Sequence, residues 1–248
     1  MADLALTFIG SGNTFAPGGL CWNGFVVDGK HLFEAPPTTL MALNRLGIDP
    51  NEIETVVISH HHGDHILGIP FLLLHWKFFG RTKPVRIIGP RGTRELAMSI
   101  TQSVYPGTAE ASLPIEWIEA LPGQSTSASG IEIETLAMKH DERLADCLGF
   151  LCRYSGLTVG YTGDTAMCDG VRDLARRSDL LVSECATRDE VIPVHMNLVD
   201  DIPVVRRLLR AESPLLLTHL SPGVDGAGLA NTFVAEDFKT FRFSDLLS

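Results

Sequence analysis

The chain has 248 residues, of which 45% are hydrophobic and 20% are charged, and its formal net charge is −10. This composition is typical of a folded globular protein and excludes a chain that stays disordered. The acidic balance argues against a general nucleic-acid-binding protein, which would carry a basic surface. An anionic small molecule is not excluded, because bound divalent cations would dominate the charge of their own pocket.

The N-terminal segment, MADLALTFIG, has no basic region ahead of its apolar run, so we expect no signal peptide. The longest apolar stretch begins at Ile66 and is interrupted by Pro70, His75 and Lys77, which leaves it too short to span a membrane. Five scattered cysteines without a C-x-x-C pair fit reduced thiols better than a disulfide framework. We therefore expect a cytoplasmic protein with no membrane partner.

Short apolar runs that are typical of strands alternate with helical stretches along the chain. The expected strands cover residues 4–10, 24–28, 55–60, 85–89, 115–120, 131–138, 148–155, 157–163, 180–184 and 215–220. The expected helices cover residues 37–46, 64–79, 91–103, 166–177, 197–211 and 226–237. Pro203 is expected in the first turns of the fifth helix, where a missing N–H is tolerated. Residues 121–130, LPGQSTSASG, are expected to form a turn region and not a domain boundary.

The order of these elements predicts the layers of the fold. The first strands follow one another closely and the helices are interspersed later, which favours two sheets with helices on their outer faces over one doubly wound sheet. The chain has no internal repeat and no low-complexity tail. We therefore expect an α/β protein made of a single domain, residues 1–248.

The segment SHHHGDH, residues 59–65, holds four of the nine histidines in the chain. His60 and His62 are two positions apart, so both imidazoles project to the same side of an extended chain. Asp64 and His65 follow at the expected start of a helix and point elsewhere. This spacing favours two ligands for one metal and two for a neighbouring metal.

The donor atoms of this cluster narrow the choice of metal. Imidazole nitrogens and carboxylate oxygens suit zinc, with manganese or iron as alternatives. Gly63 allows the sharp turn between the two ligand pairs. His61 alternates away from its neighbours, so we expect it not to be a ligand. A run of surface histidines without a metal is the competing interpretation, which the embedded aspartate disfavours.

Four ligands cannot complete two metal sites, so the hypothesis requires partners further along the chain. His140, Asp164 and His219 each follow an expected strand, where the chain leaves a sheet and presents side chains to a site. His195, in the segment PVHMN, is a further polar candidate ahead of a helix. Together with the cluster, these residues indicate a dinuclear metal site.

With these residues in place, the sequence resembles the metallo-β-lactamase superfamily. The H-x-H-x-D-H motif of residues 60–65 matches the signature of that family, and His140, Asp164 in YTGDT and His219 in LTHLS follow in the family's order. The resemblance implies an αββα four-layer sandwich. It also implies one divalent metal held by His60, His62 and His140, a second held by Asp64, His65 and His219, and a bridge between them formed by Asp164.

The segments FIGSGN, residues 8–13, and YTGDT resemble the ribonuclease Z-like branch and its small phosphodiesterase relatives. The segment LLVSECAT and the later His195 resemble the HEAT segment and the non-ligand histidine of that branch, which implies that Glu184 orients a catalytic His195. Ribonuclease Z carries a tRNA-gripping arm between the positions that match His140 and Asp164. The interval here is 24 positions and leaves no room for the arm, so we expect tRNA not to be a partner.

We therefore expect a dinuclear-metal phosphodiesterase that acts on a small anionic phosphodiester, such as a cyclic phosphate or a cyclic nucleotide. In this expectation a metal-bridging hydroxide attacks phosphorus and Asp64 adds ligation and orients the nucleophile. His195 stabilises the transition state or protonates the leaving group, or is merely structural. The alternatives are a lactonase, thioesterase or other carbonyl hydrolase of the same fold, and an RNA 3′-processing endonuclease without the arm.

Two further segments leave alternatives open. Residues 81–94 include five basic residues and no acidic residue. This stretch either attracts a phosphorylated substrate or forms a solvated face. The basic residues are Arg81, Lys83, Arg86, Arg91 and Arg94. The C-terminal segment, FKTFRFSDLLS, either packs on the domain or mediates a homodimer.

Overall fold

Two seven-stranded sheets face each other in the computed structural model, which describes residues 3–109, 112–226 and 228–247. The first sheet contains β1 (Ala5–Gly10), β2 (Gly24–Val27), β3 (His31–Phe33), β4 (Thr55–Val57), β5 (Val85–Gly89), β6 (Ile115–Glu119) and β14 (Thr240–Arg242). The second contains β7 (Ser125–Ala128), β8 (Ile131–Ala137), β9 (Leu148–Tyr154), β10 (Leu157–Tyr161), β11 (Leu180–Glu184), β12 (Leu215–Thr218) and β13 (Thr232–Val234).

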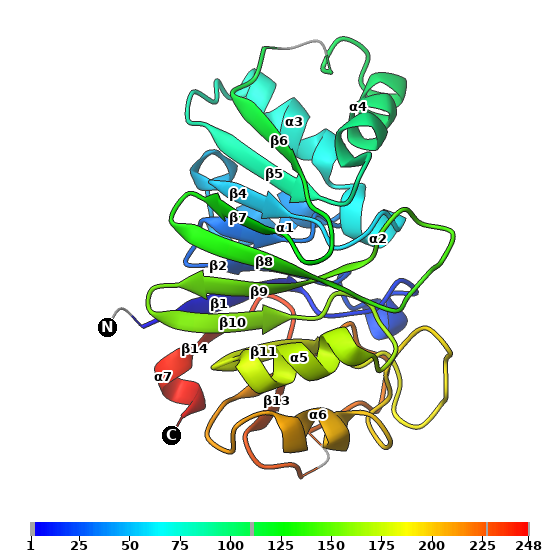
Figure 1. The fold of residues 1–248 in the computed structure, drawn as a ribbon. Helices are drawn as coiled ribbons and strands as arrows, with labels where there is room; N and C mark the ends of the chain where they lie inside the picture. The colour runs from blue at the N-terminus through cyan, green and yellow to red at the C-terminus, as the bar shows by residue number, and fades with distance from the viewer. Residues whose placement is uncertain (1–2, 110–111, 227, 248) are drawn as a thin grey trace.

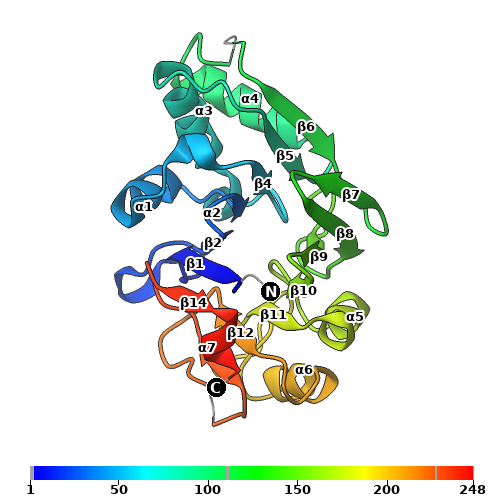
Figure 2. The same ribbon diagram turned by 90° about the vertical axis from the view of Figure 1, so that its left-hand side faces the viewer.

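Helices cover the outer face of each sheet (Figures 1 and 2). The first sheet packs against α1 (Thr39–Leu46), α3 (Ile69–Phe78) and α4 (Thr93–Val104). The second packs against α5 (Asp169–Arg177) and α6 (Ile202–Leu208). In α5 the buried positions, Val171, Leu174 and Ala175, are three and four apart and form the apolar stripe of a surface helix. This is the expected αββα arrangement.

The core between the sheets is rich in buried aromatic rings. Phe25 of the first sheet meets Tyr161 of the second with ring centroids 5.2 Å apart, and Phe33 meets Phe150 at 6.4 Å. All four side chains are almost completely buried. Aromatic rings remove a large apolar area from water, so these contacts hold the two sheets together near the site.

The parallel strands place the site at one edge of the sandwich. The first sheet is parallel from β3 to β6 and the second from β10 to β13, in the orders β14-β1-β2-β3-β4-β5-β6 and β13-β12-β11-β10-β9-β8-β7. The carboxyl ends of parallel strands share an edge, so the loops after β4, β10, β11 and β12 emerge together. They lie on the right-hand side of Figure 1, beside α2 (Gly63–Ile66).

Several expected elements differ in detail. The helix expected over 64–79 is two helices, α2 and α3, because Gly68 packs against the carbonyl of Pro36 and Pro70 starts a new helix. The helix expected over 226–237 is wrong, since Asn231 has φ +49° and β13 follows it. Pro203 lies in the first turn of α6, as predicted. Four short strands of the described structure, β3, β7, β13 and β14, lie outside the expected strands, and β7 lies within the expected turn region 121–130.

The C-terminal segment packs on its own chain. Strand β14 pairs antiparallel with β1, with Ala5 opposite Arg242, and the short helix α7 (Phe243–Leu246) follows. Leu246 is buried. Within the residues that the structure describes, no helix has the length and apolar character needed to cross a membrane.

Arg81, the first residue of the basic stretch, is a structural residue. Its side chain is buried, and its guanidinium donates hydrogen bonds to five backbone carbonyls and lies 4.8 Å from the ring centroid of Trp76. The accepting carbonyls belong to Pro50, Asn51, Ile53, Lys83 and Pro84. The planar fork of arginine suits this task, and it locks the loop before β4, which leads to the metal-binding segment.

We predict that Arg81→Met lowers the free energy of unfolding by about 3 kcal/mol, because buried carbonyl oxygens lose their charged donor. For a chain of this size the melting temperature should fall by about 6–10 °C. Thermal unfolding followed by circular dichroism measures this. Arg91→Met is the control, because Arg91 is exposed in the same basic stretch. Equal melting temperatures for the two variants would contradict the structural role of Arg81.

Candidate metal centre and active site

The loop after β4 carries the histidine cluster into the seam between the sheets. The strand expected over 55–60 ends at Val57, so His60 lies with His62 in the loop that follows and not in the strand. Their rings nevertheless face the same point. Asp64 and His65 lie in the single turn of α2, and both are buried. The predicted division of the cluster into two pairs is therefore present.

His60, His62 and His140 form the first ligand cluster. His62 Nδ1 lies 3.1 Å from His60 Nε2 and 3.1 Å from His140 Nε2. A single hydrogen on His62 Nδ1 cannot form hydrogen bonds to both of these nitrogens. In a tetrahedral zinc site with metal–nitrogen bonds of about 2.0 Å, ligand atoms lie about 3.3 Å apart, which fits this spacing. The His140 ring is oriented from behind, because Nδ1 donates to the carbonyl of Val194 at 3.0 Å.

Asp64, His65 and His219 form the second ligand cluster. Asp64 Oδ2 lies 3.4 Å from His65 Nε2 and 3.7 Å from His219 Nε2. His219 has φ +59°, a strained backbone conformation for a residue with a side chain. In this conformation the imidazole, at the end of β12, lies beside the carboxylates of Asp64 and Asp164.

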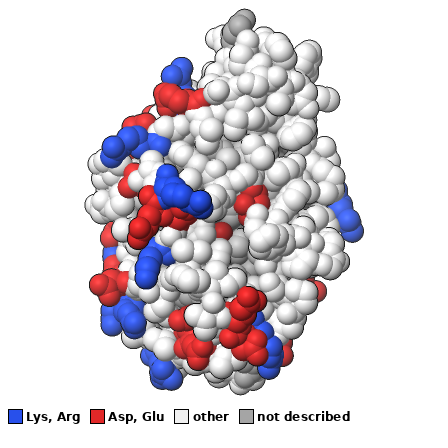
Figure 3. Space-filling view, turned by 90° about the vertical axis from the view of Figure 1, so that its right-hand side faces the viewer, with Lys and Arg blue, Asp and Glu red and all other residues white. Residues whose placement is uncertain are grey.

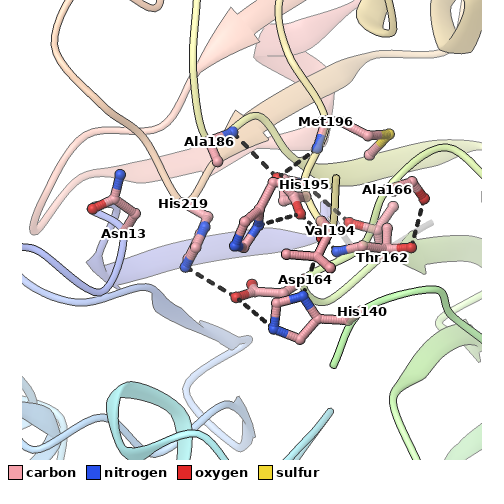
Figure 4. Close-up of polar contacts among 12 residues, drawn as sticks. Asn13, His140, Thr162, Asp164, Ala166, Ala186, Val194, His195, Met196 and His219 are labelled. Carbon is pink, nitrogen blue, oxygen red and sulfur yellow. Dashed lines mark hydrogen bonds and ion pairs between the residues drawn. The ribbon is translucent and has the colours of Figure 1, made fainter. Parts of the chain in front are cut away.

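Asp164 lies between His140 of the first cluster and His219 of the second (Figure 4). Its Oδ2 atom is 3.1 Å from His219 Nε2 and 3.3 Å from His65 Nε2. The same oxygen is 3.8 Å from His60 Nε2 and 4.0 Å from His140 Nε2. Burial raises the pKa of Asp164, but the neighbouring imidazoles, His219 first, outweigh burial and hold the pKa well below its usual value. Asp164 is therefore a carboxylate that faces both clusters.

The buried polar atoms of the site fit metal ions. Among the described residues, both ring nitrogens of His65 and of His219 and the Oδ1 atom of Asp164 make no hydrogen bond, although all are buried. Such atoms are costly to leave without a partner. Burial lowers the pKa of His60 well below its usual value, so its ring is neutral and has a lone pair to offer. Nitrogen and oxygen donors in this arrangement suit divalent zinc.

His61 lies outside both clusters, as predicted. Its Nε2 atom is 2.8 Å from Thr93 Oγ1, at the start of α4. Burial lowers the pKa of His61, which leaves a neutral ring in this contact. The side chain therefore fastens the metal-binding loop to a neighbouring helix.

Glu184 and His195 form a hydrogen-bonded pair beside the clusters, and Figure 4 shows His195 near His140 and His219. Glu184 lies at the end of β11, is 1% exposed, and lies 2.9 Å through Oε1 from His195 Nδ1. Three backbone N–H groups also donate to the Glu184 carboxylate, those of Thr165, Ala186 and Met196. Burial lowers the pKa of His195, but the hydrogen bond that Nδ1–H donates to the Glu184 carboxylate outweighs burial and raises the pKa to about 9. Because Nδ1 is engaged, Nε2 is the ring atom that His195 offers to the pocket.

Glu34 is a site residue that the sequence analysis missed. The side chain is fully buried, Oε1 accepts a hydrogen bond from the Tyr161 hydroxyl at 3.0 Å, and Oε2 accepts one from the Ser59 N–H at 3.2 Å. Oε2 also lies 3.5 Å from His65 Nδ1, the ring atom on the far side from the second cluster. Carboxylates in this position orient metal-binding histidines. Glu34 follows β3, a strand too short to stand out in the sequence.

Asp141 is a second residue that was missed. Its Oδ2 atom lies 3.2 Å from His62 Nε2, so it contacts the ring nitrogen that points away from the first cluster. Arg143 holds this carboxylate with two side-chain hydrogen bonds of 2.8 and 2.6 Å. An acidic residue directly after His140 was the available sequence signal. The Asp141–Arg143 pair therefore fixes the rotation of the His62 ring.

The clusters open into a pocket of about 1020 Å³. Part of its lining, which we call the apolar rim, consists of Phe15, Trp22, Leu67, Ile192 and Pro193. Charged lining residues include Lys139, Glu142 and Arg143. In the described part of the chain, none of the five basic residues of stretch 81–94 lines this pocket. Figure 3 looks onto the side from which the site loops emerge in Figure 1, and Lys and Arg are interspersed there with Asp and Glu.

We predict that Asp164→Ala abolishes tight metal binding, because one carboxylate serves both clusters. Dialysed wild-type protein should carry about two metals per chain, as the two clusters suggest, and the variant less than one, measured by plasma mass spectrometry. Since a metal that binds only the folded state stabilises it, a chelator should lower the melting temperature of the wild type only. The exposed Asp189→Ala is the control. Unchanged metal content in Asp164→Ala would refute this centre.

We predict that Asp141→Asn weakens metal binding about 10- to 100-fold, because the His62 ring loses its orienting carboxylate. Competition with a chromophoric chelator measures the dissociation constant without any assay of activity. Glu142→Gln is the matched control, since this exposed carboxylate is adjacent in the chain. The same affinity in both variants would show that the Asp141–His62 contact does not tune the centre.

Comparison with curated proteins identifies ribonucleases as relatives. Ribonuclease BN of Escherichia coli is 27% identical over an alignment of 274 positions, which covers 87% of this chain and 90% of that protein. Ribonuclease Z of Thermococcus kodakarensis is 27% identical over 197 residues, 62% of each chain. Ribonuclease Z of Methanocaldococcus jannaschii is 46% identical over 72 residues. The chain spans only 22% and 62% of the lengths of the Methanocaldococcus and Thermococcus enzymes.

Solved structures share the fold. Human tRNase Z, short form, superposes with a TM-score of 0.79 at 21% identity, covering 96% of this chain and 99% of that one. A diphosphatase from the PhnP family has a TM-score of 0.77 at 19% identity, covering 96% and 97%. The family model of the beta-lactamase superfamily domain matches residues 27–220, and this fold implies binding of divalent metal. The chain therefore belongs to the metallo-β-lactamase superfamily of hydrolases, as its sequence predicted.

Proposed function

We propose that the protein is a dinuclear-metal phosphodiesterase that acts on a small phosphodiester. The observation that carries the proposal is the position of His195. It lines the metal pocket, is held by the buried Glu184, and keeps Nε2 free of that hydrogen bond. An imidazole beside the two clusters, with one ring nitrogen directed at the pocket, is suited to an anionic substrate whose leaving group needs a proton.

The reaction is an in-line displacement at phosphorus. Metals bound at the two clusters would supply a water of lowered pKa and neutralise charge on the phosphate. The water oxygen bonds to phosphorus, its proton passes to solvent, and the P–O bond to the leaving group breaks. His195 donates its Nε2 proton to the departing alkoxide and is reprotonated from solvent. Asp64, at the start of α2, would be a metal ligand of the second cluster and would also orient the nucleophile.

An RNA 3′-processing activity is the second candidate, because the relatives named ribonuclease Z and ribonuclease BN match this chain. Two features weigh against it. The interval between His140 and Asp164 has no room for a tRNA-gripping arm, and the net charge is −10. A carbonyl hydrolase, such as a lactonase or thioesterase, would use the same ligands but would have less need of a proton donor at His195.

We further propose zinc as the metal and a cytoplasmic location.

We predict that the zinc-loaded protein hydrolyses bis(p-nitrophenyl) phosphate and that His195→Ala lowers kcat by about 10²- to 10⁴-fold, as expected for loss of a general acid. Metal content should stay at the wild-type level, because His195 is not a ligand in this proposal. The rate is measured from the increase in visible absorbance as p-nitrophenolate is released. His75→Ala, on the remote α3, is the control.

The contrary outcomes lead to the other candidates. Full metal loading without diesterase activity would refute the proposal and direct the search to lactones and thioesters. Cleavage of a precursor tRNA at its 3′ end, with bis(p-nitrophenyl) phosphate untouched, would establish the RNA-processing alternative.

A further inference from the structure

A row of hydrogen-bonded side chains crosses the seam between the sheets behind the second ligand cluster. Thr218 Oγ1 donates a hydrogen bond to Asn23 Oδ1 at 2.6 Å. Asn23 Nδ2 donates to the Tyr161 hydroxyl at 2.9 Å, and that hydroxyl donates to Glu34 Oε1 at 3.0 Å. All four residues are at most 1% exposed. We call Thr218, Asn23, Tyr161 and Glu34 the buried network.

Both ends of the buried network lie beside ligands of the second cluster. Thr218, the last residue of β12, directly precedes His219, whose φ is +59°. At the other end, Glu34 Oε2 lies 3.5 Å from His65 Nδ1. Asn23 and Glu34 flank β2 and β3 of the first sheet, whereas Tyr161 and Thr218 end β10 and β12 of the second. Two of the three ligands of this cluster are therefore linked through side chains from both sheets.

The buried network makes its contacts away from water. Hydrogen bonds are stronger in such a low-dielectric interior, and a fully satisfied network makes its surroundings rigid. Ring contacts hold Tyr161 as well, because its centroid lies 5.2 Å from that of Phe25 and 5.9 Å from that of Phe33. Ligands that are already fixed lose little conformational freedom on binding, which favours affinity. The second cluster is therefore preorganised for a metal.

The first cluster depends on a weaker support at His62. The His62 side chain is 37% exposed, and the carboxylate that orients it, Asp141, is held by Arg143, whose side chain is 88% exposed. Exposed ion pairs are screened by salt and contribute little to stability. In the second cluster the three ligand side chains are at most 7% exposed. The two clusters therefore differ in how firmly their ligands are held.

We propose that the two metal sites are unequal. The second cluster holds its metal tightly through the buried network, and the first cluster holds an exchangeable metal. Tyr161 is a positioning residue, which acts on the second site through Glu34 and His65. This inference rests on the dinuclear centre of the proposed function, but not on the substrate. When divalent metal is scarce the protein keeps one metal, so the supply of metal controls the amount of dinuclear enzyme.

Stepwise titration with zinc against a chromophoric chelator tests the proposal with the metal alone. Wild-type protein should bind zinc in two steps whose dissociation constants differ by at least about tenfold. Tyr161→Phe should raise the dissociation constant of the tight step about 10- to 100-fold, as expected for loss of a contact that orients a ligand, and leave the loose step unchanged. Thr218→Val, at the other end of the network, should act in the same direction. Tyr154→Phe is the matched control, because Tyr154 ends β9 and packs against His31, outside the buried network.

Variants of single ligands identify the cluster that each step fills. His62→Ala should keep the tight step and His219→Ala should lose it, whereas Asp141→Asn should weaken the loose step only. Cobalt(II) provides a spectroscopic signature, because its visible absorption reports the geometry of its ligands. The spectrum of the one-metal form should be the same in wild type and His62→Ala, and should change in Tyr161→Phe. Circular dichroism shows whether each variant is folded, and Thr218→Val gives the same test if Tyr161→Phe is not.

The possible failures are distinguishable. Two equal steps, a tight step that survives in His219→Ala, or an equal weakening of both steps in Tyr161→Phe would overturn the inference and leave the dinuclear centre standing. Fewer than two metals per chain at saturating zinc would refute the dinuclear centre of the proposed function, and the inference with it.

Discussion

The burial of charged and polar ligand atoms at the seam between the two sheets is the constraint on which this structure depends. Asp164 is 3% exposed, and its carboxylate lies within 4.0 Å of four imidazoles. A buried carboxylate would be very costly without compensating charge. The imidazoles provide part of that charge, and the divalent metals that this fold implies would provide the rest. The site is therefore stable only as a unit, and each ligand depends on the others.

The scaffold around this unit supplies the orientation of its rings. Glu34 faces the outer nitrogen of His65, Asp141 faces that of His62, and the Val194 carbonyl accepts from His140. These three contacts come from three separate loops, so the metal clusters tie together both sheets. Glu34 itself has φ +62°, and His219 has φ +59°. Strain at both positions is tolerated because the surrounding contacts determine them fully.

One short loop joins metal binding to the proposed acid catalysis. Val194 orients the ligand His140, and the next residue, His195, meets Glu184. Glu184 in turn receives the N–H of Met196, so three consecutive residues are fixed. A shift of this loop would disturb the His140 ring and the His195–Glu184 contact together. If His140 and His195 have the roles proposed for them, metal binding and proton donation depend on the same loop.

Much of the site could be predicted from the sequence because ligands are local and chemically distinctive. The H-x-H-x-D-H motif and the residues that follow strands, His140, Asp164 and His219, are brought together as expected. Glu184 meets His195, as the resemblance implied. Their roles as ligands and catalysts stay predictions. The layers of the fold followed from the order of strands and helices, and the family match and the neighbouring structures confirm them.

The missed features share a physical cause, which is that they depend on contacts between distant segments. Glu34 gains its role only when β3 pairs with β4 and brings it to Ser59 and His65. The helix expected over 226–237 overlooked two glycines and the Thr232–Val234 run, which pairs with β12 as a strand. From the sequence alone Arg81 is expected to be an exposed charged residue. Only the structure shows the backbone carbonyls that accept its hydrogen bonds. Hydrophobic periodicity predicts which face of a helix or strand is buried. It does not predict which residues of a distant segment will pack against that face.

The same difference between local motifs and distant contacts explains why the candidate metal ligands can be predicted from the sequence and the substrate cannot. The ligands lie at the ends of strands, and their positions follow from the sheet. The apolar rim comes from loops that begin far apart in the chain, at residues 13–22, 67 and 192–193. Asn13 joins the first of these loops to the His219 segment through Ser221. Because that link holds the first loop near the His219 segment, we expect loop geometry, and not ligand identity, to determine the size and shape of the group that this site accepts.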